Sequence, residues 1–235
     1  MKALPTELHF PSPAPVQRCY HKERMASSFS SQIPVILHLL GKLQPKSVLD
    51  VGKGFGKYGF LLHEYVGIDN AQRPQPTLSL RDQSRIVIDA VESNPDYMWP
   101  HLDQIYRQVY SARIEDVFKS GLPAYDLVLM IDVIEHLTKE SGLDIVRHFI
   151  HLGYKVIMST PRRFFQQELY GSDDEHHLSH WTPSDFNGVC KYDYQNCDDG
   201  QVFLLSREVI DIRGFGHSPI KRLRRIARAL HNELP

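Results

Sequence analysis

The sequence has few cysteines, no excess of charge of either sign and no long apolar run. Its three cysteines, Cys19, Cys190 and Cys197, are too few for a disulfide framework or a four-cysteine zinc site. The 27 Lys and Arg residues nearly cancel the 28 Asp and Glu residues, so nucleic acid is not expected as a partner. No stretch approaches the roughly 18 apolar residues of a membrane span, and the first residues do not resemble a signal peptide. We expect a soluble, cytoplasmic protein.

The composition is that of an ordinary globular domain. Hydrophobic residues make up 42% of the 235 residues and charged residues 23%, which is enough for one domain with a full core. Residues 1–30 are expected to form an N-terminal arm, because their prolines interrupt helices and central strands. Residues 31–212 are expected to form an α/β domain, and residues 213–235 a basic C-terminal helix.

Short apolar runs alternate with helical patterns along the middle of the chain. This alternation predicts a Rossmann-like α/β fold, a doubly wound and mostly parallel sheet. Two later runs separated by polar residues and Gly200 predict an antiparallel hairpin that closes the sheet at its C-terminal side. The expected strands cover residues 47–52, 85–92, 109–114, 125–131 and 155–159, with the hairpin at 191–194 and 202–205; the expected helices start at Ile33 and cover 56–65, 95–107 and 139–151.

A glycine-rich loop follows the first expected strand. Gly52, Gly54 and Gly56 let the backbone turn sharply and let a ligand approach without a Cβ in the way. Asp50 ends the strand before them, where a carboxylate can face a cationic ligand. The spacing of Gly54, Gly56 and Gly59 also satisfies the dinucleotide-binding pattern, so the glycines alone do not distinguish nicotinamide from other nucleoside cofactors.

Three features together distinguish between the nucleoside cofactors that the glycine loop could bind. They are Asp50 before the loop, the run Asp-Val-Ile-Glu-His-Leu at residues 132–137, and the closing hairpin. In this combination the chain resembles the class I S-adenosylmethionine-dependent methyltransferases. The dipeptide Thr160-Pro161 and the run from Glu175 to Phe186 are similar to the small-molecule branch of that superfamily. The resemblance extends over residues 33–208.

The resemblance implies S-adenosylmethionine as the cofactor, with the glycine loop around its methionine portion. An acidic residue that ends the second strand would bind both ribose hydroxyls. Glu92 and Asp69 compete for that role, and Glu92 is favoured because it ends the better strand. Beside the adenine, Arg113 or Ile114 stands where family members usually have an acidic residue. The candidate cofactor-binding residues are Asp50, Gly52, Lys53, Gly54, Phe55, Gly56, Glu92, Ser93, Ile114, Asp132 and Val133.

Several residues are candidates to lie where methyl transfer would take place, and two of them, His136 and Asp132, have an alternative structural role. His136 is either a general base, since its ordinary pKa suits proton removal at neutral pH, or a structural residue behind the site. Asp132 either faces the cofactor or caps a helix. The resemblance implies that the segment around His177 covers the acceptor pocket, so His177 is a second catalytic candidate. Candidate substrate-binding residues are Tyr170, His176 and Trp181.

The polar residues 173–177 and His180 form the densest polar cluster in the chain. Carboxylates and imidazoles at this density can ligate a divalent metal, but the cluster has no fixed ligand spacing, and no metal site is expected there. The basic tail can contact an anionic membrane surface or pack on its own domain, and packing is favoured.

The leading functional hypothesis is methyl transfer from S-adenosylmethionine to a small-molecule or glycan-like acceptor, on oxygen or nitrogen. One alternative is a nicotinamide-dependent oxidoreductase that uses the same glycine loop. The other is a cofactor-fold binding protein that has lost catalysis.

Overall fold

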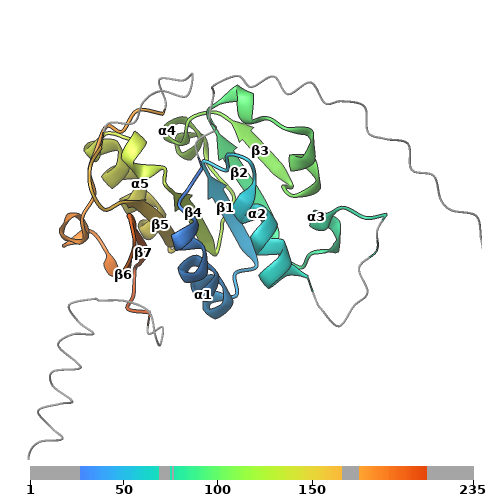
Figure 1. The fold of residues 1–235 in the computed structure, drawn as a ribbon, viewed down its shortest axis with the longest axis horizontal. Coiled ribbons are helices and arrows are strands. Elements are labelled where there is room, and N and C mark those ends of the chain that lie inside the picture. The colour runs from blue at the N-terminus through green and yellow to red at the C-terminus, as the bar shows by residue number, and fades with distance from the viewer. Residues whose placement is uncertain (1–26, 69–74, 76, 166–174, 211–235) are drawn as a thin grey trace, which may run out of the picture.

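The protein is built on one seven-stranded sheet, seen in a computed structural model that describes residues 27–68, 75, 77–165 and 175–210. The strand order is β3-β2-β1-β4-β5-β7-β6, so β3 and β6 form the two edges (Figure 1). Neighbouring strands from β3 to β5 pair in parallel, and β7 pairs antiparallel with both β5 and β6. The predicted fold is confirmed. The strands are β1 (Ser47–Val51), β2 (Val87–Glu92), β3 (Gln108–Ser111), β4 (Leu127–Ile131), β5 (Lys155–Pro161), β6 (Lys191–Cys197) and β7 (Gly200–Ser206).

The central strands are apolar on both faces because helices and turns cover both sides of the sheet. Along β1, Val48 belongs to the core on one face, whereas Leu49 belongs to the core on the other. In the register, Val48 lies between Ile88 of β2 and Leu127 of β4. Each strand therefore divides its side chains between two cores, as its alternating geometry requires.

Helices of very different length pack on these two faces. Helix α1 and the shorter α2 contribute Leu39, Leu40 and Leu62 to the first core. Helix α5 contributes Ile145 and Phe149 to the second core. Figure 1 shows α1 and α2 beside β1 and α5 beside β5. The helices are α1 (Ile33–Leu43), α2 (Lys57–Leu62), α3 (Leu80–Gln83), α4 (Ile114–Val117) and α5 (Lys139–His151).

The segment between β2 and β3 differs from the sequence expectation. Instead of one helix over residues 95–107, the chain makes two 3-10 turns, Pro95–Tyr97 and Pro100–Gln104. Proline disfavours helical geometry in the residue before it, and Trp99 is extended, with φ −92° and ψ 145°. Strand β3 also ends three residues before Ile114, which begins α4 instead of ending a strand.

Several expectations fall wholly or partly on residues that the structure does not describe. They are most of the N-terminal arm, the basic tail, and part of the long connection between α2 and β2, which contains Asp69. Among the helices of the described residues, none has the length and apolar character needed to cross a membrane.

Candidate functional site

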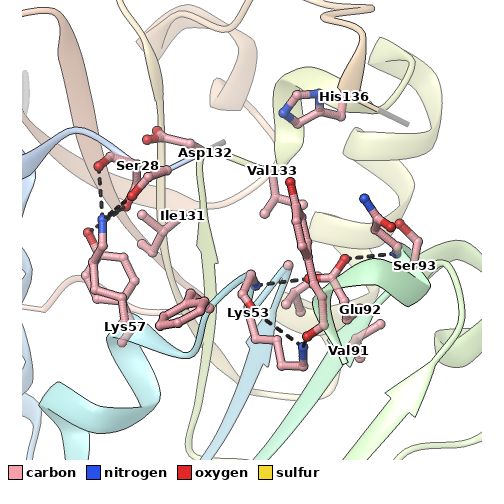
Figure 2. A pocket seen from close by; sticks show the side chains of 18 of the residues that line it. Ser28, Lys53, Lys57, Val91, Glu92, Ser93, Ile131, Asp132, Val133 and His136 are labelled. Atoms are coloured by element: carbon pink, nitrogen blue, oxygen red, sulfur yellow. Dashed lines mark hydrogen bonds between the residues drawn. The ribbon is translucent and has the colours of Figure 1, made fainter. Parts of the chain in front are cut away.

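A cavity of about 1150 Å³ lies where the carboxyl ends of β1, β2 and β4 meet. This edge is where parallel α/β sheets bind their ligands. Figure 2 shows Lys53, Glu92 and Ser93 on one side of the cavity, Lys57 and Ser28 on another, and His136 above them. The predicted site residues that line it are Gly52, Lys53, Gly54, Phe55, Gly56, Glu92, Ser93, Ile114, Asp132, Val133, His136 and His177.

The glycine loop after β1 takes a backbone path that other residues rarely adopt. Gly52, Gly54 and Gly56 all have positive φ, at 68°, 51° and 85°. A Cβ on Gly52 would lie 2.4 Å from Val133 Cγ2, so the loop also packs tightly against the end of β4. At Gly54 a Cβ would meet nothing within 4 Å, which leaves the middle of the loop open to the cavity.

Glu92, at the end of β2, is held in place by two backbone amides. Its Oε2 accepts a hydrogen bond from Gly54 N and its Oε1 accepts one from Asn94 N, both at 3.0 Å. Burial raises the pKa of the Glu92 carboxyl, while these two amides and the nearby Lys53 ammonium oppose that shift. Lys53 Nζ itself donates to Tyr97 O at 2.8 Å. Each carboxylate oxygen has a second lone pair, so Glu92 can still accept hydrogen bonds from a ligand.

Asp50 does not lie where the sequence suggested. Its side chain is buried under the loop and is not among the residues that line the cavity. Its Oδ2 accepts a hydrogen bond from the Tyr106 hydroxyl at 2.6 Å. Burial raises the pKa of Asp50 to about 6, even though the Tyr106 hydrogen bond lowers it. Asp50 therefore supports the loop from below and does not line the cavity, because the sheet directs it toward the core that contains Tyr106.

Aromatic and apolar side chains form the wall beside Glu92. Phe55 is 54% exposed, and its ring centroid lies 4.6 Å from that of His101. The ring nitrogen Nε2 of His101 lies 2.9 Å from Phe55 O. Ile114, at the start of α4, is buried and also lines the cavity. A flat apolar group would fit between these surfaces.

Asp132, after β4, is positioned by the segment that precedes α1. It is one of two non-glycine residues with positive φ in the described part of the chain, at 52°. Its carboxylate accepts hydrogen bonds from Gln32 Nε2 at 3.0 Å, from Ser159 Oγ at 2.7 Å and from Phe29 N at 3.3 Å. Asp132 lines the cavity and is not the helix cap that the sequence left as an alternative.

Lys57 was missed by the sequence analysis. Its ammonium donates to Ser27 Oγ at 2.8 Å and to Ser28 O and Ser28 Oγ at 3.0 Å (Figure 2). Burial lowers the pKa of Lys57, and the Asp132 carboxylate opposes that shift. Its position directly after the glycine loop was the available signal. Lys57 therefore connects residues 27 and 28 to the rim of the cavity.

Glu135, His136 and His177 meet at the end of the cavity beyond Asp132. One ligand atom from each residue lies within 4.8 Å of the others, a spacing that can hold a metal ion. Burial raises the pKa of Glu135 well above its usual range, and Asp132 raises it further. Burial lowers the pKa of His177, and His136 lowers it further, so a neutral imidazole is favoured there.

Two of the three candidate substrate-binding residues, His176 and Trp181, are not among the described residues that line the cavity. Trp181 is fully buried in the second core, where it stacks on Phe186 and packs against Gly142 of α5. It does not line the cavity, because its indole N–H is used by Ile134 O and Ser179 Oγ in the interior. His176 is also absent from the lining, although its carbonyl oxygen lies 3.1 Å from His136 Nδ1. Tyr170 lies outside the described residues.

The fold of the chain is similar to that of several solved structures, although no family model and no curated protein matches its sequence. Among solved structures, monomeric WbdD superposes with a TM-score of 0.54 at 15% identity, over 82% of this chain and 45% of WbdD. An O-methyltransferase family protein from Burkholderia thailandensis gives a TM-score of 0.50 at 10% identity, over 77% of this chain and 57% of that protein. The chain thus spans about half the length of these two proteins.

A third structure is similar over most of both chains. The plantazolicin methyltransferase BamL, solved with a triazolic desmethylPZN analog and SAH, has a TM-score of 0.51 at 12% identity. The match covers 76% of this chain and 86% of BamL. The strand order, the antiparallel β7 and these superpositions agree. The chain has the class I methyltransferase fold.

Proposed function

We propose that the chain binds S-adenosylmethionine in this cavity and transfers its methyl group to a small-molecule or glycan-like acceptor. The observation that carries the proposal is the placement of Glu92. Its buried carboxylate ends β2, is fixed by the amides of Gly54 and Asn94, and borders a large cavity. A carboxylate fixed in this way can accept hydrogen bonds from two neighbouring hydroxyls, as a ribose presents them.

The other lining residues suit the remaining parts of the cofactor. The open backbone at Gly54 leaves room for the methionine portion, and the wall formed by Phe55 and Ile114 suits a flat base. Asp132 adds a negative charge at the opposite end, which suits a cationic ammonium or sulfonium group. The neighbouring structure of BamL with SAH supports the choice of cofactor.

When bound, S-adenosylmethionine would supply an activated methyl group, so the protein needs mainly to orient the acceptor in line with it. His136 and His177 line the end of the cavity beyond Asp132. Both are candidates to contact the acceptor and to orient it. The lining of the cavity includes buried side chains from three strand ends, which give a bound ligand an apolar floor.

Isothermal titration calorimetry tests the cofactor directly. The full chain is titrated separately with S-adenosylmethionine, S-adenosylhomocysteine and NADH, and the first two are expected to bind. Glu92→Gln removes the charge and one acceptor oxygen. Because a hydrogen bond to a charged group contributes about 1.5–3 kcal/mol, its affinity for S-adenosylmethionine should fall about 10- to 100-fold.

The matched control is Glu64→Gln, which removes an exposed carboxylate outside the cavity and should bind normally. Binding of NADH without S-adenosylmethionine would favour an oxidoreductase instead. Cofactor binding with no transfer of a labelled methyl group to any of a panel of hydroxyl and amine acceptors would favour a binding protein without catalysis.

A further inference from the structure

Glu135, His136 and His177 form a cluster of ligand-type side chains at one end of the cavity. Their candidate ligand atoms, a carboxylate oxygen and two imidazole nitrogens, all lie within 4.8 Å of one another. Glu135 and His136 lie in the 3-10 turn Ile134–His136 after β4, whereas His177 lies much further along the chain. All three line the same cavity.

The backbone fixes this meeting of distant segments. Leu178 N and Ser179 N both donate to Glu135 O, at 2.7 and 3.0 Å. Ser179 Oγ donates to Leu137 O at 2.8 Å, which attaches the same segment on the other side of His136. His177 is therefore held against the 3-10 turn by its neighbours in sequence, without using its own imidazole for that purpose.

Both histidines are oriented by backbone carbonyl groups. His136 Nδ1 lies 3.1 Å from His176 O, and His177 Nδ1 lies 2.8 Å from Phe165 O. A carbonyl oxygen only accepts hydrogen bonds, so each Nδ1 carries the proton, and in the neutral ring the lone pair is then on Nε2. Metal-binding histidines commonly have this arrangement, in which one nitrogen donates to a carbonyl and the other binds the ion.

Glu135 is the member of the cluster that the surrounding protein leaves incompletely satisfied. The residue is 2% exposed, and its Oε2 has no hydrogen-bond partner among the described residues. A buried carboxylate oxygen without a partner is unfavourable unless a cation or a donor approaches it. Asp132 also lies close enough to interact electrostatically with Glu135 and His177, which increases the negative potential there.

We propose that Glu135, His136 and His177 bind one divalent transition-metal ion at the acceptor end of the cavity. Two imidazoles and one carboxylate favour ions such as Mn²⁺, Fe²⁺, Co²⁺ or Zn²⁺ over Mg²⁺ and Ca²⁺, which prefer oxygen ligands. All three residues line the cavity, and three protein ligands would leave coordination positions open for a ligand. An oxygen atom of the methyl acceptor would occupy one of them, a role that rests on the proposed methyl transfer.

The sequence alone did not predict this site. The polar cluster at 173–177 was weighed by itself, and its members have no ligand spacing. In the structure only His177 of that cluster joins the site among the described residues, because β4 and the segment before β6 come together in space. The Glu135-His136 dipeptide supplies the other two ligands.

The test uses the full chain without a histidine tag, freed of metal with a chelator. Mn²⁺, Co²⁺, Zn²⁺ and Mg²⁺ are titrated separately by calorimetry, and the Co²⁺ complex is followed by its visible absorption. We expect one transition-metal ion per chain and weaker binding of Mg²⁺. Titration of the metal-free protein with S-adenosylmethionine, done in parallel, tests the proposed function independently.

Two variants test the ligands, and one serves as a control. Glu135→Gln and His177→Ala should each weaken Mn²⁺ binding at least about tenfold. Because Glu135→Gln keeps the side-chain shape and only replaces a carboxyl oxygen with an amide nitrogen, it should fold even if His177→Ala does not. Circular dichroism checks both variants. His180→Ala removes an exposed histidine from the same segment outside the cluster and should bind Mn²⁺ normally.

The outcomes separate the two proposals. Absence of saturable binding for all four ions, or unchanged Mn²⁺ affinity in Glu135→Gln, would overturn the metal site while S-adenosylmethionine binding leaves the proposed function intact. Metal binding that is lost in the variants, in a protein that does not bind S-adenosylmethionine, would support the metal site and overturn the cofactor proposal.

Discussion

Asp50 should make the stability of the protein depend on pH in a way that a single substitution removes. Its carboxyl group is fully buried beneath the glycine loop and accepts a hydrogen bond from the Tyr106 hydroxyl. Asp50→Asn keeps the size and a polar partner for Tyr106 but cannot ionise. The substitution therefore isolates the effect of the buried charge.

The magnitude follows from the shifted pKa. Burial raises the pKa of Asp50 from 3.8 to about 6 in the folded protein. Ionising this group then costs about 3 kcal/mol more in the folded protein than in the unfolded chain. Because the folded-state pKa is raised, the stabilisation from the protonated form is complete below pH 3.8 and is lost as the pH rises through about 6.

Urea denaturation followed by circular dichroism measures this effect. The free energy of unfolding is determined for both proteins from about pH 4 to about pH 7, and the difference between them is compared across that range. The difference removes the contributions of carboxyls that do not interact with Asp50 and are present in both proteins. Relative to Asp50→Asn, the unmodified protein should lose about 2 kcal/mol across this range, because part of the full effect of about 3 kcal/mol is already lost below pH 4.

An exposed aspartate provides the control for Asp50→Asn. Asp144→Asn removes an aspartate of α5 whose ion pair with Arg147 is exposed, and its difference from the unmodified protein should hardly change with pH. If the difference for Asp50→Asn also stays constant over the range, Asp50 is not a buried acid of raised pKa, and the account of its role under the loop is wrong.

Three further predictions concern two glycines in helices and the segment before α1. Gly142→Ala should destabilise the protein by about 1–3 kcal/mol in urea denaturation, because the new Cβ would lie 2.6 Å from Trp181 Cζ2 in a packed core. Gly41→Ala, in α1 with nothing within 4 Å, should instead stabilise it by up to about 1 kcal/mol. Lys57→Met removes the hydrogen bonds to Ser27 and Ser28, so amide hydrogen exchange should become faster near these two residues while the core strands keep their protection. Unchanged exchange there would show that Lys57 does not hold the segment.

The strands and long helices were predictable from sequence because their signals are local. Helix α5 begins and ends at Lys139 and His151, the bounds that its apolar periodicity indicated. The region from 95 to 107 was predicted less well, as one helix, although it contains Pro100. That proline divides the segment into two turns.

Much of the cavity lining was also predictable, because these residues follow strand ends and strand ends meet at one edge of a parallel sheet. Contacts between distant segments were not. Asp50 was expected to face the ligand, but Tyr106, far along the chain, binds it from the opposite side. Trp181 was expected beside the acceptor, but it fills the space above Gly142. The sequence pattern indicates on which face of the sheet a side chain lies. It does not indicate which side chain from a distant segment will contact it there.

The central claim is that the carboxylate of Glu92 binds the ribose of S-adenosylmethionine, and a crystal structure of the chain with S-adenosylhomocysteine tests it most directly. The account predicts both ribose hydroxyls within hydrogen-bonding distance of Glu92, the base beside Ile114 and the sulfur directed toward Asp132 and His136. A nucleoside bound with its ribose away from Glu92, or a cavity that stays empty at saturating ligand, would contradict it.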